Sequence, residues 1–231
     1  MKILNWNVEW PTSKRWAVIK DIIFRIHPDI ICLNEAHNKH CFAGYNWIEA
    51  HPEYGYGEHP SKRKVILGST DLWRDVSMGD HLDIPTGRFI GGRTQGIEVL
   101  GVCIPWKDSN VRTGRKDREP WQDHLQFLNG IKDKVQKKYK MIAGDFNQRI
   151  PRKLQPEKCY QNLMDVFDGF QIPTQWPDLE TSDGKQHIDH VALGFGLTAV
   201  GASSIARYEE GMELSDHDGI VLYFNYVIDH E

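Results

Sequence analysis

Five short segments, spread over the whole chain, carry side chains that could perform hydrolytic chemistry. Each segment adjoins an apolar run, as Asn34-Glu35 follows the run from Ile30 to Leu33. Such runs predict strands, and side chains at the ends of strands in an α/β protein converge on one cleft. The segments are Asn5-Trp6-Asn7-Val8-Glu9, Leu33-Asn34-Glu35, Gly144-Asp145-Phe146-Asn147, Ile188-Asp189-His190 and Ser215-Asp216-His217.

The carboxylates of these segments predict a bound divalent cation. Like charges gathered in a partly dry cleft repel strongly unless a cation lies among them. Mg²⁺ prefers oxygen ligands and is usually held by one or two carboxylates together with a substrate phosphate. A cation and positioned donors are also needed when water attacks a phosphate ester. We therefore expect Mg²⁺ or Mn²⁺ as cofactor among Glu9, Glu35, Asp145, Asp189 and Asp216.

Taken singly, each segment fits an ordinary turn, helix entry or loop. Taken together and in this order, they resemble the exonuclease/endonuclease/phosphatase superfamily of metal-dependent phosphoesterases. Its members include DNase I-like nucleases, abasic-site endonucleases and inositol polyphosphate 5-phosphatases. The resemblance runs from residue 2 to about residue 224. It implies a DNase I-like α/β fold, in which two sheets form a sandwich with helices on the outer faces.

The resemblance implies catalytic roles for five residues. Asn7 matches an asparagine that contacts the phosphate and the metal shell, and Asp145 matches the aspartate assigned to the attacking water. Asn147 matches an asparagine that stabilises the transition state. Asp189 matches the aspartate that orients His217, the histidine that touches the phosphate. A carboxylate that accepts from one ring nitrogen raises the imidazole pKa, so we expect the other nitrogen of His217 to hold a phosphate oxygen as a cation.

Three further positions match the metal site of the superfamily, and one position departs from its pattern. Glu35 matches the main metal ligand, while Glu9 and Asp216 match acidic residues close to it. Many members carry a Tyr or His phosphate donor in the strand before Pro105, whereas this chain has Cys103 or Val102 at that position, and neither is a good donor. Either the missing contact comes from other residues, for example Lys107, Arg112 or Arg115, or this member depends less on it.

Composition bounds the remaining possibilities. With 231 residues, 40% of them hydrophobic, the chain can form one large domain over residues 1–231. The formal net charge of −4 excludes a uniformly basic nucleic-acid binder. No stretch approaches the roughly 18 apolar residues of a membrane span and no apolar leader precedes the first motif, so we expect a cytoplasmic protein. The four cysteines show no close pairing, which agrees with a reducing compartment and argues against structural zinc.

The hydrophobic pattern predicts alternating strands and helices. Helices are expected after the capping pair Thr12-Ser13, after Pro120 and over residues 157–167. The turn-rich run Gly91-Gly92-Arg93-Thr94-Gln95-Gly96 lies between two strand-like runs with no helix after it, which indicates a hairpin and not a phosphate-binding loop. Strands are expected at residues 2–8, 29–33, 45–50, 65–69, 97–104, 140–143, 188–193, 197–208 and 219–224.

Three functions remain open. The first is a nuclease acting on DNA or RNA, because the basic residues between Trp106 and Trp121 lie beside tryptophans that could stack on bases; Arg112 and Arg115 would then bind the substrate. The second is a phosphatase or phosphodiesterase for a small or lipid-linked phosphate, which the acidic balance permits. The third, a catalytically silent binding module, ranks last because no catalytic carboxylate is missing. The sequence carries no signal for the number of subunits.

Overall fold

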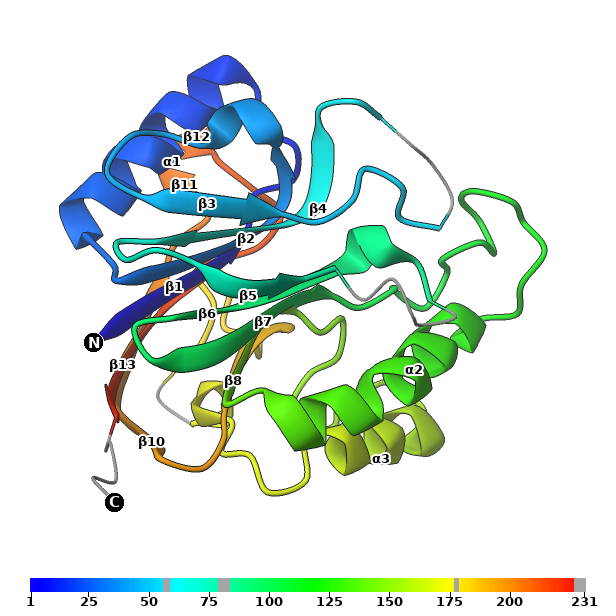
Figure 1. The fold of residues 1–231 in the computed structure, drawn as a ribbon. Coiled ribbons are helices and arrows are strands. Elements are labelled where there is room, and N and C mark those ends of the chain that lie inside the picture. The colour runs from blue at the N-terminus through cyan, green and yellow to red at the C-terminus, as the bar shows by residue number, and fades with distance from the viewer. Residues whose placement is uncertain (56–58, 79–83, 177–178, 227–231) are drawn as a thin grey trace.

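The computed structural model describes residues 1–55, 59–78, 84–176 and 179–226. Two sheets pack face to face, and helices cover both outer faces (Figure 1). The two-sheet α/β sandwich predicted from the sequence is therefore confirmed. None of the described helices is long and apolar enough to cross a membrane.

The first sheet has six strands in the order β10-β13-β1-β2-β4-β3. Helix α1 (Ser13–Ile26) crosses over between β1 and β2, which are therefore parallel, and the other neighbours are antiparallel. Thr12 caps this helix, as predicted, by accepting from the backbone N–H of Arg15 at 3.3 Å. The strands are β1 (Lys2–Asn7), β2 (Ile30–His37), β3 (Asn46–Glu49), β4 (Lys62–Ser69), β10 (Leu197–Ile205) and β13 (Gly219–Tyr226).

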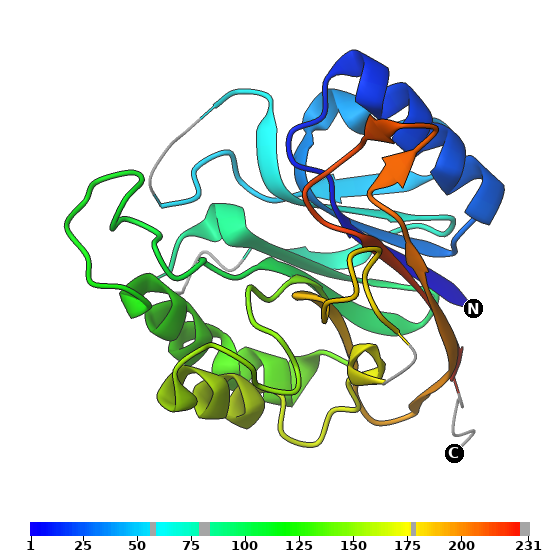
Figure 2. The same cartoon turned by 180° about the vertical axis from the view of Figure 1, so that it is seen from behind.

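The second sheet has five strands in the order β5-β6-β7-β8-β9. Helix α2 (Gln122–Lys138) connects the parallel strands β7 and β8, and α3 (Glu157–Val166) lies beside α2 on the outer face (Figures 1 and 2). The strand predicted over 197–208 ends at Ile205, and a small hairpin, β11 (Tyr208–Glu209) with β12 (Met212–Glu213), follows it. The strands of the second sheet are β5 (Arg74–Ser77), β6 (Phe89–Thr94), β7 (Ile97–Cys103), β8 (Met141–Asp145) and β9 (Asp189–Leu193).

The hairpin predicted over residues 91–96 is confirmed, and its turn lies at Gln95 and Gly96, at the end of that run. Gly91 and Gly92 lie inside β6. A Cβ atom at Gly91 would come within 2.4 Å of the Tyr139 hydroxyl oxygen, so glycine is required there for close packing between the sheet and the end of α2.

Three apolar layers hold the sandwich together, because successive strand residues point to opposite faces. Along β1, Ile3 belongs to the layer between the sheets and Leu4 to the layer beneath α1. Along β7, Leu100 packs under α2, while Cys103 faces the layer between the sheets. The amphipathic helices and strands therefore bury their apolar faces as the pattern predicts.

Two buried asparagines connect the sheets at one edge of the sandwich. The Asn5 side chain donates from the first sheet to the carbonyl oxygens of Gly144 and His190, both at 3.2 Å. The Asn34 side chain donates to the Val102 carbonyl at 2.8 Å and accepts from the Asp145 backbone N–H at 3.0 Å. These bonds fix the relative position of the two sheets at the edge where the motif residues lie.

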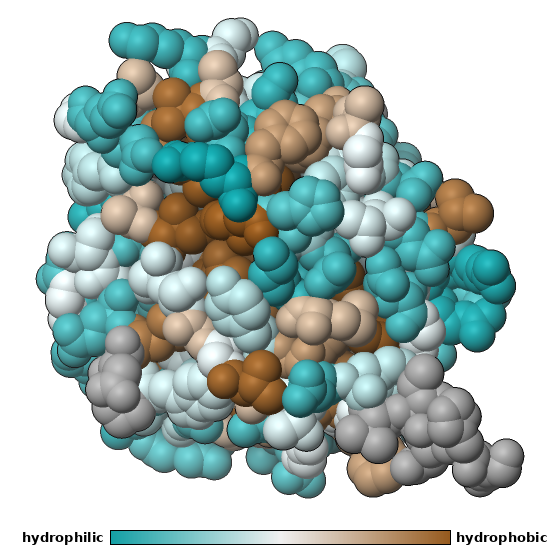
Figure 3. Space-filling model, turned by 90° about the vertical axis from the view of Figure 1, so that its left-hand side faces the viewer, coloured by the Kyte–Doolittle hydropathy of each residue, from teal (hydrophilic) through white to brown (hydrophobic). Residues whose placement is uncertain are grey.

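The N-terminus and the end of β13 lie on the opposite side of the molecule. β1 begins at Lys2 and ends at Asn7, while β13 begins two residues after His217 and ends at Tyr226. Figure 3 shows the face on which the N-terminus lies, where apolar side chains appear among polar ones. The motif residues therefore face away from this surface.

Candidate active site

The motif residues come together at the asparagine-linked edge of the two sheets. Asn7 ends β1, Glu35 lies in β2, Asp145 ends β8, and Asp189 opens β9 opposite Asp145. The loop before β13 brings in His217 beside them. A cavity of about 220 Å³, here called the central pocket, is lined by Asn7, Glu35, Lys64, Arg88, Cys103, Trp106, Asp145, Asn147, Asp216 and His217.

Asp145 is the most tightly held carboxylate of this pocket. It is only 3% exposed, and its two oxygens accept from the backbone N–H and the side-chain amide of Asn147, both at 2.9 Å. Asn7 donates a third bond to it at 3.2 Å. Burial raises the pKa of Asp145 to about 7, and the charges of Asp189 and Glu35 add to this effect against the opposing charge of His217. Asp145 can therefore exchange a proton near neutral pH.

Gly144, the residue before Asp145, explains how the strand can end in this position. Its φ of 148° lies outside the region that other residues favour, and a Cβ atom there would be 1.8 Å from the Val102 carbonyl oxygen. Glu35 and Asn147 also have positive φ values, 53° and 54°. Such conformations persist only where the surrounding structure fixes them, and they are enriched at functional sites.

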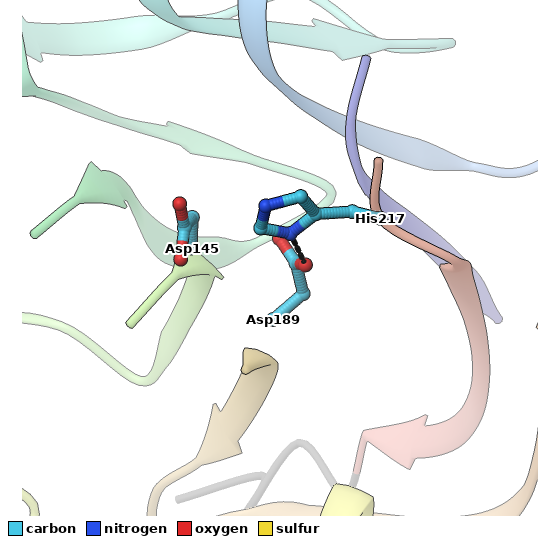
Figure 4. Close-up of side chains that lie close together, drawn as sticks. All are labelled: Asp145, Asp189 and His217. Carbon is cyan, nitrogen blue, oxygen red and sulfur yellow. Dashed lines mark hydrogen bonds and ion pairs between the residues drawn. The ribbon is translucent and has the colours of Figure 1, made fainter. Parts of the chain in front are cut away.

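His217 and Asp189 form the predicted pair. The Nδ1 atom of His217 lies 2.5 Å from an oxygen of Asp189, and Figure 4 shows the imidazole between this carboxylate and that of Asp145. Burial lowers the pKa of His217, but the charge of Asp189 and its hydrogen bond outweigh burial and raise the pKa to about 10. The ring is therefore a cation at neutral pH, with Nδ1 engaged by Asp189.

The predicted metal ligands take different positions. Glu35 and Asp216 line the central pocket together with Asp145, so three carboxylates offer hard oxygen ligands that suit Mg²⁺ or Mn²⁺. Burial raises the pKa of Asp216. Within the described part of the chain, one set of acidic and histidine ligand atoms lies within 4.8 Å of one another, and it consists of Asp145, Asp189 and His217. In that set Asp189 does not line the central pocket and His217 is engaged with it, so the candidate ligands in the pocket are Asp216 and Glu35, the latter also paired with Lys64 at 2.5 Å.

Glu9 and the two predicted substrate arginines do not line this pocket. Glu9 forms an ion pair with Arg15 of α1 at 2.9 Å. The Arg112 and Arg115 side chains are 75% and 56% exposed, and each lies 3.5 Å from an aspartate of its own loop. These arginines therefore offer less positive charge to a substrate than the sequence suggests.

Lys64 and Arg88 are basic residues of the central pocket that the sequence analysis did not assign to it. Lys64 Nζ lies 2.5 Å from Glu35 Oε1, and its side chain is 7% exposed. Arg88 is 2% exposed and donates to the carbonyl oxygens of Cys103, at 3.2 Å, and Tyr54, at 2.9 Å. The sequence signal for Lys64 was its position directly before the apolar run Val65 to Leu67 of a buried strand.

Cys103, a weak hydrogen-bond donor, lies beside these two cations in the central pocket. Of the two residues that the resemblance places at the Tyr or His position, Val102 packs in the layer beneath α2 and Cys103 lines the central pocket. Burial raises the pKa of the Cys103 thiol to about 12, so it stays neutral and is a weak donor. Arg88 donates to the Cys103 carbonyl, so a buried cation lies beside this position.

The remaining polar residues near the motifs have structural partners. The Asn147 amide nitrogen donates to the Ile104 carbonyl at 2.8 Å as well as to Asp145, so both of its amide hydrogens are engaged. His190 is fully buried between the Thr174 hydroxyl at 2.5 Å and the Gln148 carbonyl at 2.9 Å. Asn147 positions Asp145 in this geometry, and His190 is a packing residue.

Comparisons with known proteins agree with this geometry. The model described as "Endonuclease/Exonuclease/phosphatase family" matches residues 4–217. No curated protein matches the chain significantly. Among solved structures, an AP endonuclease from Archaeoglobus fulgidus is similar over 97% of this chain and 99% of its own, with 20% identity and a TM-score of 0.75.

Two other solved structures show the same fold at lower identity. A 3'-5' exonuclease from Neisseria meningitidis has 17% identity and a TM-score of 0.72, over 98% of this chain and 100% of its own. D. rerio TDP2, complexed with a single-strand DNA product, has 13% identity and a TM-score of 0.68, over 97% of this chain and 98% of its own. The DNase I-like fold expected from the sequence is thus confirmed.

Proposed function

The chain belongs to the endonuclease/exonuclease/phosphatase family of hydrolases that act on phosphate esters, and on that premise we propose that it hydrolyses phosphodiester bonds of DNA or RNA. One observation carries the proposal: a charged histidine and two buried cations line a single pocket together with three carboxylates, one of which, Asp145, can accept a proton. A phosphate group needs each of these elements when water attacks it.

In this proposal Asp145 is the general base. The water oxygen forms a bond to phosphorus, the bond to the leaving oxygen breaks, and Asp145 accepts the proton that the water loses. A pKa near 7 suits a base that works at neutral pH. Asn7 and Asn147 hold its carboxylate in place through the bonds at 3.2 and 2.9 Å.

The phosphate is held from several sides. His217 donates from Nε2, because its other ring nitrogen is engaged by Asp189. Lys64 and Arg88 supply the donors that the residue at position 103 lacks. Glu35 and Asp216 would hold Mg²⁺ or Mn²⁺, which when bound supplies positive charge for the transition state. Asn7, whose side-chain oxygen accepts from the Glu9 backbone at 3.1 Å, supports this side of the pocket.

Nucleic acid is the substrate class that we favour. The similar solved proteins include an AP endonuclease, a 3'-5' exonuclease and a protein bound to a single-strand DNA product, which supports this choice without establishing it. The test is to incubate the protein with Mg²⁺ or Mn²⁺ and single-stranded DNA, duplex DNA, abasic-site DNA, RNA or phosphate monoesters. We expect cleavage of at least one nucleic acid that stops in excess chelator. Turnover of monoesters alone would favour the small-substrate phosphatase.

A further inference from the structure

A second cavity, of about 300 Å³, adjoins the central pocket and shares Trp106 and Asn147 with it. It is here called the tryptophan pocket. Its apolar side chains are exposed to different degrees: Trp106 and Trp121 are half-buried, and Leu154 is 84% exposed. The lining residues are Trp106, Lys107, Trp121, Asn147, Gln148, Arg149, Leu154, Gln155 and Ile188.

Hydrogen bonds to backbone carbonyl oxygens close the two loops that form this pocket. The Trp121 backbone N–H donates to the Lys107 carbonyl at 2.7 Å, which closes the loop between the two tryptophans. The Gln155 side chain donates to the Arg149 carbonyl at 2.5 Å, which closes the loop that carries Leu154. Each of the two loops that form the pocket is therefore closed by a hydrogen bond, and apolar side chains of the pocket remain accessible to solvent.

The charges at the pocket favour an anionic ligand. Neither Lys107 nor Arg149 forms an ion pair with any residue that the structure describes, in contrast to Arg112 and Arg115. Arg149 also lines a third cavity, which shares Ile188 with the tryptophan pocket and in which Lys185 and Arg207 are both paired with Asp183, at 2.6 and 3.4 Å. A chain of phosphates leaving the central pocket would therefore meet Lys107 and Arg149, the cations beside Trp106 and Trp121 that have no ion pair among the described residues.

We propose that the tryptophan pocket binds an unpaired nucleobase of the nucleotide next to the cleaved phosphate. The inference rests on the proposed function, because the shared residues place the base beside the reacting phosphate. A nucleobase has flat apolar faces on which Trp106 and Trp121 can stack, and its phosphates would lie near Lys107 and Arg149. Stacking of this kind tolerates every base, so the preferred substrate is a single strand or a frayed end, without strong sequence preference.

Binding measurements on a cleavage-deficient Asp145→Asn protein test the proposal. Fluorescence anisotropy with Mg²⁺ would compare a labelled oligothymidylate with an oligomer of the same length built from base-free tetrahydrofuran units. We expect the Asp145→Asn protein, which is the parent for the further variants, to bind the thymidylate roughly 5- to 150-fold more tightly than the base-free oligomer. Trp121→Ala and the exposed Leu154→Ala should reduce this preference and leave affinity for the base-free oligomer unchanged, while Trp121→Phe should retain it.

A matched pair of charge variants separates stacking from phosphate contacts. Lys107→Ala should weaken binding of both oligomers equally and reduce the salt dependence of the logarithm of affinity by about 0.7 per contact, whereas the aspartate-paired Arg112→Ala should change it less. Equal affinity of the parent for both oligomers, or a preference unchanged by Trp121→Ala and Leu154→Ala, would overturn the base pocket. The proposed function is judged separately, by whether the unmutated protein cleaves these oligomers at all.

Discussion

His217 Nδ1 lies 2.5 Å from Asp189 Oδ2, and this contact joins the segment before β13 of the first sheet to the start of β9 in the second. The carboxylate is 1% exposed. The histidine is also held from its backbone, because the Trp6 indole donates to its carbonyl oxygen at 2.9 Å. The position of the imidazole therefore depends on both sheets, so its orientation is fixed before a substrate binds.

Asp189→Asn should lower the pKa of His217, because Asp189 is the main group that raises it to about 10. A raised histidine pKa stabilises the fold fully below pH ~6.5, and this contribution is lost as the pH rises toward 10. As the pH is raised, the variant should therefore lose activity at a lower pH than the parent. Its melting temperature should also fall less than that of the parent between neutral pH and pH 10. Titration of the His217 ring by NMR would measure the pKa, and an unchanged value would contradict the assigned pair.

Glu35→Gln should weaken Mg²⁺ or Mn²⁺ binding far more than Glu9→Gln. Glu35 lines the central pocket with two other carboxylates, whereas Glu9 does not line it. Both residues are ion-paired, Glu35 with Lys64 at 2.5 Å and Glu9 with Arg15 at 2.9 Å, so the two variants differ in position and not in pairing. Isothermal titration of the ion into the three proteins measures the difference, and the Glu9 variant is the matched control for loss of one charge. Equal losses in both variants, or full activity of the parent in excess chelator, would count against Glu35 as the main ligand.

The protein should lose stability in mild acid through its buried neutral histidines. Burial lowers the pKa of His124 and His190 to about 4 in the folded protein, compared with ~6.5 when unfolded. Their contribution is therefore complete above pH ~6.5 and is lost as the pH falls toward 4, by up to roughly 3 kcal/mol each. Urea unfolding from pH 7 to 4.5 would show this decline. His124→Gln should make the decline shallower, and an equally steep decline would refute the assignment.

Arg88→Met, which retains much of the volume but removes the charge, should raise KM and lower kcat together. We expect kcat/KM to fall by roughly tenfold or more.

Cys103→Tyr, made in the otherwise unchanged protein, should not raise the rate, although a phenol could donate to a phosphate. The thiol is 2% exposed and packed in the layer between the sheets, so a larger ring should cost about 1 to 3 kcal/mol of stability. Steady-state kinetics and thermal melts of both variants measure these effects. A Cys103→Tyr protein with normal stability and a higher rate would show that this position contacts the phosphate directly.

The fold was predictable from the sequence because its periodic elements agree with one another. The apolar face of α1, its Thr12 cap and the runs on either side of it describe one strand-helix-strand unit without reference to the rest of the chain. The edge strand β5 was not predicted, because its residues are mostly exposed and show no apolar alternation. The sequence pattern placed the turn only within the run from Gly91 to Gly96, because it did not show that Gly91 and Gly92 lie inside a strand, where Gly91 packs against Tyr139.

The site was predictable only where the motif residues themselves carry the chemistry. Asp189 and His217 meet as predicted, since both follow from strand ends at the same edge. Arg88 was not predicted because a single arginine before a strand has no local signal, and its role depends on β6 lying beside β7. Glu9 was expected at the metal site, yet the ion pair with Arg15 depends on how the loop before α1 turns. The cellular compartment and the identity of the ion remain predictions.

The central claim is that Asp145 and His217 act directly on a phosphodiester in the central pocket. The most direct measurement is the rate of cleavage of a labelled oligonucleotide with Mg²⁺ by the parent, Asp145→Asn and His217→Ala, together with the melting temperature of each. Asp133→Asn, at an exposed position on α2, is the control. The two site variants should fold normally and lose about 10²- to 10⁴-fold in rate, while the control keeps the parent rate. Folded site variants that retain the parent rate would contradict the assignment.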